Sequence, residues 1–151
     1  MDLSARLRKM RLLLIEDDEW VRDSLSLFFE SEGCHLMALE TGEEGRRELE
    51  NQTYDIIIID YRLPDMDGLE FSKLIRSSHP QAMKILISAY GSTDVVSEAQ
   101  ETCIHDCIEK PFTAGIIEES LLGLIEQRQA FSGKGYTGNK DLTPLFRFNK
   151  E

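Results

Sequence analysis

The sequence predicts a single α/β domain built around a doubly wound parallel sheet. Short apolar segments typical of strands alternate five times with amphipathic segments typical of helices. Crossovers of helical length join parallel strands with a right-handed turn, so helices are expected on both faces of the sheet. The chain has 151 residues, of which 41% are hydrophobic, and this is enough for one sizeable core.

The first two strand and helix units cover the N-terminal third of the chain. A buried strand is expected at residues 11–16, and the helix after it, in EWVRDSLSLFFESEG, has Gly33 as its stop signal. Three apolar side chains share the inward face of this helix: Val21, Leu25 and Phe28. A weaker strand at 34–40 leads into the polar segment TGEEGRRELENQ, whose first turn Thr41 can cap through its hydroxyl.

The third unit opens with four consecutive isoleucines at residues 56–59. A continuous β-branched run of this kind is typical of a strand covered on both faces, as in a parallel sheet. Asp60 follows directly, at the point where the strand ends. A helix is then expected at about 69–78, and its inward face is formed by three residues: Phe71, Leu74 and Ile75.

The fourth and fifth units complete the alternation. Strands are expected at 83–91 and 105–111, and helices at 92–103 and 113–129. Ser92 or Thr93 is expected to cap the first of these helices. The inward face of the second is formed by three residues in register: Ile117, Leu121 and Leu124.

The segment after the last helix differs in composition from the rest of the chain. Residues 131–151 are rich in glycine and basic side chains, so we place the domain at 1–130 and expect a flexible C-terminal tail or the start of a linker. About twenty residues are too few for an effector domain. The chain is therefore expected either to act alone through protein contacts or to be cut from something longer.

The charge of the chain restricts the partners that it can bind. The net charge of −11 and the isoelectric point near 4.7 argue against direct nucleic-acid binding, which needs clustered basic residues. The apolar run at residues 12–15 is too short for a signal peptide or a membrane span. We expect a cytoplasmic protein with no membrane contact, in which any nucleic-acid role belongs to another domain.

The three cysteines are expected to be buried, reduced thiols. Cys34, Cys103 and Cys107 are an odd number in a chain of this length, which does not suggest a disulfide framework. Cys103, His105 and Cys107 lack the paired Cys-x-x-Cys spacing of structural zinc sites. Packing is therefore preferred to zinc binding for this group.

Polar side chains stand at the carboxyl ends of four predicted strands. The first strand ends in the acidic residues 16–18, the third in Asp60, the fourth in Ser88 and the fifth in Lys110. Ligands of doubly wound sheets bind at these strand ends. A single aspartate there would usually only begin a loop, but carboxylates, a hydroxyl and an ammonium at one edge form a candidate site.

The chemistry of this edge indicates a magnesium-dependent phosphoryl acceptor. Crowded carboxylates repel one another unless a cation lies between them, and oxygen ligands with room for water suit Mg²⁺. The sequence EDDEW lacks the glycines that cradle a dinucleotide, so no nucleotide cofactor is expected. Beside Mg²⁺, Asp60 becomes a candidate nucleophile toward phosphorus. Lys110 can pair with one phosphoryl oxygen, and Ser88 can donate a hydrogen bond to another.

Four motifs give a more specific indication. IEDDEWVR, DYRLPDMDG, ISAYG and EKPF occur in the order and at the spacing found in the receiver domains of two-component response regulators, and the resemblance runs from about residue 11 to 128. The resemblance implies a flavodoxin-like three-layer sandwich with strand order 2-1-3-4-5. It also implies that Asp60 is the phosphorylated aspartate, Ser88 the switch hydroxyl and Lys110 the invariant lysine.

The same resemblance implies the ligands of the metal. Glu16 and Asp17 match the acidic pair of the family, with Asp17 as a direct ligand of Mg²⁺ and Glu16 acting through water. Asp60 and the backbone carbonyl of Arg62 complete the set, while Asp18 more naturally begins the helix. The peptide bond between Lys110 and Pro111 is expected to be cis.

Two positions depart from the family pattern. Cys107 stands where relatives have the tyrosine or phenylalanine that moves with the switch hydroxyl, and Cys103 stands where relatives often have glycine. We expect Cys107 to pack as a small hydrophobic residue. The movement started by Ser88 is then expected to pass through Tyr90 and the helix at 92–103.

The resemblance implies a phosphorylation-controlled switch that accepts its phosphoryl group from a sensor histidine kinase or a phosphotransfer protein. A homodimer is expected through the face formed by the helix at 92–103, the strand at 105–111 and the helix at 113–129. Two alternatives remain open: a magnesium-dependent aspartyl-phosphate hydrolase and a degenerate receiver that serves as a scaffold. A hydrolase of the haloacid dehalogenase type needs a second aspartate where Arg62 stands, so turnover of a substrate is not expected.

Overall fold

The computed structural model describes residues 2–89, 97–99, 104–133 and 145–147. The expectations for Tyr90, Ser92, Thr93 and Cys103 lie outside these residues.

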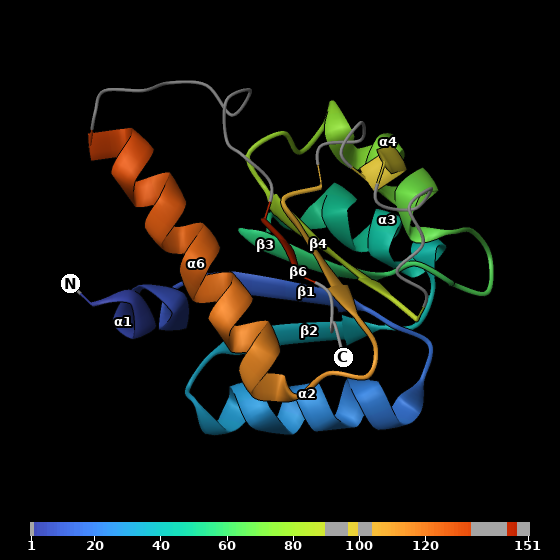
Figure 1. The fold of residues 1–151 in the computed structure, drawn as a ribbon. Coiled ribbons are helices and arrows are strands. Elements are labelled where there is room, and N and C mark those ends of the chain that lie inside the picture. Colours follow the sequence, from blue (N-terminus) through green and yellow to red (C-terminus); the bar gives the residue numbers. More distant parts are fainter. Residues whose placement is uncertain (1, 90–96, 100–103, 134–144, 148–151) are drawn as a thin grey trace.

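The described strands form one parallel sheet in the order β2-β1-β3-β4-β5-β6 (Figure 1). The bounds of these strands are β1 Arg11–Ile15, β2 His35–Leu39, β3 Ile56–Asp60, β4 Met83–Ser88, β5 Asp106–Glu109 and β6 Leu145–Arg147. The five predicted strands are all present, and their predicted order 2-1-3-4-5 is confirmed. Their residues agree with the prediction except at the ends, where β4 stops at Ser88.

The structure adds a sixth strand within 131–151, where the sequence analysis expected a flexible tail or the start of a linker and no strand. Leu145–Arg147 pairs in parallel with β5, with Phe146 opposite Cys107. The physical reason is that β5 would otherwise leave its outer backbone groups without a strand partner. A chain that returns along a helix can add a parallel strand beside the last one, as in the earlier units.

Helices cover both faces of the sheet (Figure 1). Their bounds are α1 Leu3–Arg8, α2 Glu19–Ser31, α3 Gly42–Asn51, α4 Gly68–Arg76 and α6 Ala114–Gly133. The first helix was not predicted: Asp2 caps it by accepting a hydrogen bond from the backbone of Ala5, and Leu7 is buried in the same apolar cluster as α6 residues. The predicted capping of α3 by Thr41 is confirmed, and Glu44 completes a capping box.

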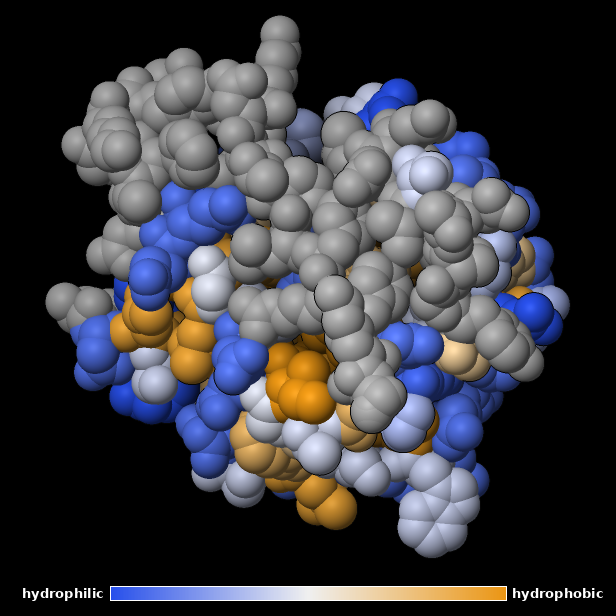
Figure 2. Space-filling model, viewed as in Figure 1, coloured by the Kyte–Doolittle hydropathy of each residue, from blue (hydrophilic) through white to orange (hydrophobic). Residues whose placement is uncertain are grey.

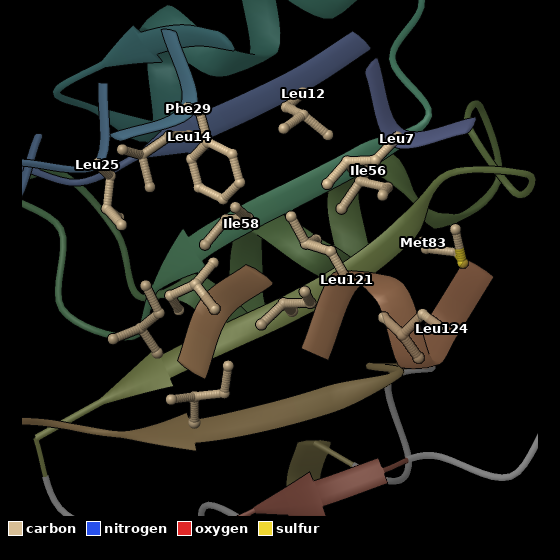
Figure 3. Close-up of a cluster of buried hydrophobic side chains, with 14 of the residues drawn as sticks. Leu7, Leu12, Leu14, Leu25, Phe29, Ile56, Ile58, Met83, Leu121 and Leu124 are labelled. Carbon is tan, nitrogen blue, oxygen red and sulfur yellow. The ribbon is translucent and has the colours of Figure 1, made fainter. Parts of the chain in front are cut away.

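The isoleucine run divides between the two faces, as a strand covered on both sides requires. Ile56 and Ile58 join the cluster beneath α1, α2 and α6 (Figure 3), whereas Ile57 and Ile59 pack with α3 and α4. Residues of β1 alternate in the same way. Each fully buried side chain of this size stabilises the fold by about 1.5–3 kcal/mol relative to exposure, so the sheet is a rigid base for its carboxyl edge.

The predicted inward faces of the helices are largely confirmed. Ile117, Leu121 and Leu124 are buried, and so are Phe71 and Ile75. In α2 the most deeply buried residues are Leu25 and Phe29, with Val21 and Phe28 partly buried beside them.

The inward position predicted for Leu74 is wrong. Its side chain is 55% exposed, because the buried face of α4 follows the spacing of four between Phe71 and Ile75. Among the helices in the described ranges, we find none with the length and apolarity that crossing a membrane requires.

Candidate phosphoryl-acceptor site

Four side chains named by the sequence analysis come together at the carboxyl edge of the sheet. Asp60 and Ser88 are the last residues of β3 and β4, Glu16 follows β1, and Lys110 follows β5. Asp60 is opposite Ile87 in the β3 and β4 pairing, so its position along the sheet is fixed by the ladder. Glu16 and Ser88 are completely buried, and Asp60 is 5% exposed.

Lys110 connects the carboxylates from β1 and β3. Its Nζ atom lies 3.2 Å from Glu16 Oε1 and 3.4 Å from Asp60 Oδ1. The backbone N–H of Lys110 donates to the carbonyl of Ser88 over 2.7 Å. The peptide bond between Lys110 and Pro111 is cis, which confirms that prediction. The Lys110 side chain is 24% exposed, and its two carboxylate neighbours hold the ammonium inside the site.

Glu16, Asp17 and Asp60 form the group of potential metal ligands found within the described ranges. One carboxylate oxygen from each lies within 4.8 Å of the others. Glu16 Oε1 receives no well-aligned hydrogen bond from the described residues, and the nearby Lys110 ammonium is shared with Asp60. Three hard oxygen donors, two buried and one exposed, fit a magnesium ion that keeps some of its water.

Asp18 lies outside that group and begins the helix, as predicted. Its Oδ1 atom accepts hydrogen bonds from the backbone of Trp20 at 2.8 Å and of Val21 at 3.3 Å. Glu16 Oε2 accepts in turn from the backbone N–H of Asp18 at 3.0 Å. Residues 16–18, which we call the acidic loop, are therefore held in one conformation by their own hydrogen bonds.

The electrostatics of the site favour arrival of a cation. Burial raises the pKa of Glu16 to about 7, and the neighbouring Asp60 adds to this effect. Burial also raises the pKa of Asp60, although Lys110 opposes the shift. For Lys110, burial disfavours the charged form, but Asp60 and Glu16 outweigh it and raise the pKa. Without a further positive charge, the site carries more negative charge than one ammonium offsets.

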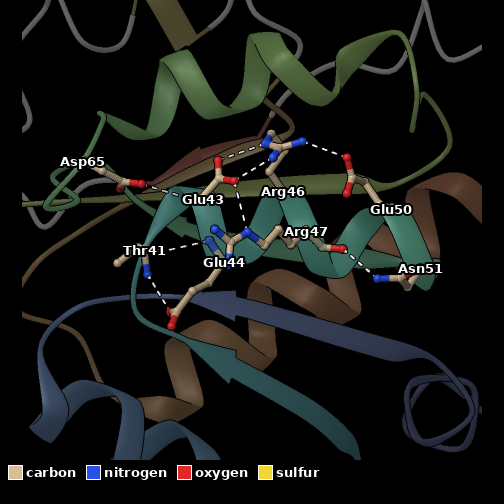
Figure 4. Close-up of polar contacts among 8 residues, drawn as sticks. All are labelled: Thr41, Glu43, Glu44, Arg46, Arg47, Glu50, Asn51 and Asp65. Carbon is tan, nitrogen blue, oxygen red and sulfur yellow. Dashed lines mark hydrogen bonds and ion pairs between the residues drawn. The ribbon is translucent and has the colours of Figure 1, made fainter.

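The loop after Asp60 is anchored on α3. Asp65 accepts hydrogen bonds from the backbone N–H groups of Gly42 and Glu43, each at 2.9 Å. Figure 4 shows the bond from Glu43. A Cβ atom on Gly42 would lie 2.6 Å from Met66 Sδ, so the loop approaches the helix closely. The backbones of Arg62 and Asp67 form an isolated antiparallel β-bridge across this loop, and Arg62 is exposed. The metal role of the Arg62 carbonyl stays a prediction.

Cys107 is completely buried and packs as a hydrophobic residue. It lies in a small cluster on the outer part of the sheet, with Leu69, Leu86, Ala99 and Ile104, and Tyr61 packs against that cluster. Burial raises the pKa of the Cys107 thiol to about 12. Tyr61 was not singled out from the sequence, and it brings an aromatic ring to the region where Cys107 replaces one.

His105 has a different role from Cys107. Its Nδ1 atom accepts a hydrogen bond from the backbone N–H of Lys84 over 3.0 Å, at the end of β4 opposite the candidate site. The expectation of packing rather than zinc binding for this group stays a prediction. Cys103, the third member of the group, lies outside the described residues.

An apolar groove lies beside the site. It has a volume of about 480 Å³ and is lined by α2 residues, among them Trp20 and Val21, and by the segment from Lys110 to Phe112. Trp20 is 84% exposed. Figure 2 shows apolar residues exposed among charged ones on the face where α2 and α6 lie.

Comparison with known proteins gives one consistent result. The family model described as the response regulator receiver domain matches residues 12–122. Response regulator protein FleR of Pseudomonas aeruginosa is 33% identical over 104 residues, which are 69% of this chain and 22% of that protein. The chain spans 22–32% of the length of the first three curated relatives that it matches.

Solved structures agree with the sequence comparison. A receiver domain protein described as CheY-like from Methanospirillum hungatei superposes with a TM-score of 0.76 at 25% identity, covering 80% of this chain and 97% of that one. The beryllofluoride-activated NtrC4 receiver domain dimer gives a TM-score of 0.72 at 28% identity, covering 77% of this chain and 96% of that one.

Proposed function

This chain belongs to the response regulator receiver domain family, and from that membership we propose that phosphorylation of Asp60 controls its partner-binding face in a two-component phosphorelay. The observation that carries the proposal is the position of Asp60. It is the nearly buried carboxylate at the end of β3, 3.4 Å from the Lys110 ammonium and beside Glu16 and Asp17.

The proposed reaction is transfer of a phosphoryl group from a phosphohistidine to Asp60. A carboxylate oxygen of Asp60 forms the new bond to phosphorus as the bond from phosphorus to the imidazole nitrogen breaks, and the imidazole then takes a proton from water. Lys110 pairs with a phosphoryl oxygen, and Ser88 donates a hydrogen bond to another. Glu16, Asp17, Asp60 and the Arg62 carbonyl would hold Mg²⁺, which offsets the negative charge of the phosphoryl oxygens when bound.

The donor is proposed to be a sensor histidine kinase or a phosphotransfer protein that binds in the groove between α2 and the segment after β5. Lys110 lines this groove, so a helix of the donor protein that binds there can bring its phosphohistidine close to the acceptor site. Its apolar wall and the exposed Trp20 suit the hydrophobic side of such a helix. We propose that the chain and this donor meet in the cytoplasm.

Phosphorylation is proposed to act on the region beyond Ser88. A phosphoryl group adds about two negative charges, and the Ser88 hydroxyl reaches it only if the β4 end moves inward. The proposed output surface is the face formed by the predicted helix at 92–103, the strand β5 and the helix α6. Homodimerisation through this face is supported by the dimeric state of the beryllofluoride-activated NtrC4 receiver domain. Turnover of a separate substrate is not part of this function.

The proposed acceptor can be tested by intact-mass measurement after exposure to acetyl phosphate. We expect the wild type to gain one phosphoryl group with Mg²⁺ and none with a chelator. Asp60→Asn abolishes the gain, whereas Asp23→Asn, an exposed change on α2, retains it. Equal labelling of Asp60→Asn contradicts the assignment, and no labelling of the wild type favours a scaffold that has lost the reaction.

The path of the switch can be tested with amide spectra recorded with and without beryllofluoride. We expect Cys107→Ala to keep the beryllofluoride-induced chemical-shift changes of residues 92–110. The buried thiol is too small to transmit the movement of Ser88 by a change of side-chain rotamer. We expect Tyr90→Ala to reduce them. The reverse result, with shifts lost only in Cys107→Ala, makes the cysteine the switch residue.

A further inference from the structure

The acidic loop is held from outside by one guanidinium group. Arg22 Nη1, from the first turn of α2, donates hydrogen bonds to the backbone carbonyls of Glu16 and Asp17, each at 3.0 Å. Its Nη2 atom lies 3.8 Å from Glu40 Oε1, and the Arg22 side chain is 16% exposed. Arg22 thus contacts the backbone of both residues of the acidic pair and neither of their carboxylates.

We propose that Arg22 is a positioning residue for the cation site, and that it increases the affinity of Glu16, Asp17 and Asp60 for Mg²⁺. This inference rests on the proposed function, because it takes these three carboxylates as metal ligands. It assigns to Arg22 a function that acts through the backbone and not through its charge.

The geometry gives the reason. The hydrogen bonds to the carbonyls of Glu16 and Asp17 restrain the backbone dihedral angles of residues 16–18. The backbone conformation limits the rotamers that the two side chains can adopt, and so restricts where their carboxylates point. On the other side of the loop, Glu16 Oε2 is fixed by the N–H of Asp18. The loop is therefore held from both sides, and the two carboxylates face Asp60 before a cation arrives. Outer partners of this kind change metal affinity by about 10-fold to 100-fold in other sites.

Charge and positioning predict opposite signs for the same substitution. Arg22 carries a positive charge near the site, so its removal should strengthen cation binding if charge were its main effect. If Arg22 orders the loop, its removal should weaken binding, since the loop must then be ordered by the cation. The sign of the change in Mg²⁺ affinity therefore decides between the two.

The experiment is calorimetric titration of Mg²⁺ into the full chain. We expect Arg22→Met to weaken binding by about 10-fold or more. Arg22→Lys keeps the charge and can reach the carbonyls with a flexible ammonium, so an intermediate affinity is expected. Arg47→Met removes a charge from α3, where Arg47 pairs with Glu43, and is expected to match the wild type.

Urea unfolding in the presence of a chelator separates positioning from general stabilisation. A loss of Mg²⁺ affinity in a variant that unfolds at the wild-type urea concentration supports positioning. Equal or tighter binding by Arg22→Met overturns the inference and leaves the proposed function intact. If Arg22→Met does not fold, equal binding by Arg22→Lys and wild type overturns it. A wild type that binds no Mg²⁺ contradicts both the inference and the metal site of the proposed function.

Discussion

Gly68 lies directly against the backbone carbonyl of Asp60. A Cβ atom on Gly68 would lie 2.6 Å from that oxygen and 2.8 Å from Leu86 Cδ1, and the Gly68 N–H donates to the carbonyl of Tyr61 over 2.7 Å. The start of α4 can approach the acceptor residue this closely because glycine has no side chain.

Gly68→Ala is therefore expected to destabilise the protein. Forcing an extra methyl group into this contact costs about 1–3 kcal/mol. Gly115→Ala is the matched control, because a Cβ there meets only Thr113 Oγ1 at 3.7 Å within the described structure. Urea unfolding should show a loss for Gly68→Ala, while Gly115→Ala is neutral or stabilises by up to about 1 kcal/mol through helix propensity. Equal stability of the two variants would contradict this prediction, because it would mean that the backbone at the end of β3 can shift to accept the methyl group at little cost.

Asp65→Ala is expected to lower the free energy of unfolding by about 1 kcal/mol, as for the loss of other helix caps. Although burial works to raise it, the hydrogen bonds from Gly42 and Glu43 lower the pKa of Asp65, which is consistent with a bound carboxylate. Asp65→Asn keeps one acceptor oxygen and should lose less. Urea unfolding measures the difference, and identical midpoints for both variants would contradict a cap made by two oxygens.

Removal of Mg²⁺ is expected to lower the thermal midpoint of unfolding. A ligand that binds only the folded protein stabilises it by about 2.7 kcal/mol at one hundred times its dissociation constant. Differential scanning fluorimetry with Mg²⁺ or a chelator should show this shift in the wild type. Asp17→Asn removes the exposed carboxylate of the ligand group and should reduce the shift, whereas Asp23→Asn should keep it. A full shift in Asp17→Asn excludes it as a ligand.

The free energy of unfolding is expected to decrease as the pH is lowered, because His105 is protonated less readily in the folded state than in the unfolded state. Burial, together with the charges of Lys84 and Arg128, lowers the pKa of His105 from 6.5 to about 4. The folded state therefore prefers the neutral ring, and the unfolded state binds the proton more readily. The associated stability is fully present above pH 6.5 and is lost as the pH falls toward 4, by about 3 kcal/mol in total.

His105→Asn provides the comparison for this pH effect. An asparagine side chain can accept the hydrogen bond from Lys84 N but does not titrate in this range. Urea unfolding between pH 7 and 4 should show a flatter dependence for the variant than for the wild type. Parallel curves would mean that other groups cause the acid sensitivity.

The sequence was a good guide to the parts of the fold that depend on periodicity. Alternating strands and helices, the division of the isoleucine run between two faces, and the strand ends carrying Asp60, Ser88 and Lys110 all follow from local pattern and the crossover rule. Leu74 was misplaced because a helical stripe read from sequence is uncertain by one position at its border.

The contacts that hold the site were not accessible in the same way. Asp65 caps a helix 22 residues earlier in the chain, and Arg22 bonds to backbone carbonyls that any residue could supply. Neither has a residue pattern that identifies its partner. The strand at Leu145–Arg147 was also missed, because pairing with an open sheet edge can order three residues whose composition suggests a tail.

The two edges of the sheet differ in what they offer to another molecule. β6 is a strand of three residues, and a strand this short gives little length for pairing with a second chain. The opposite edge, β2, has five residues with His35 and Met37 exposed. Aggregation at high protein concentration is therefore expected to begin at β2, and Met37→Lys is the substitution expected to suppress it while leaving the phosphoryl-acceptor edge unchanged.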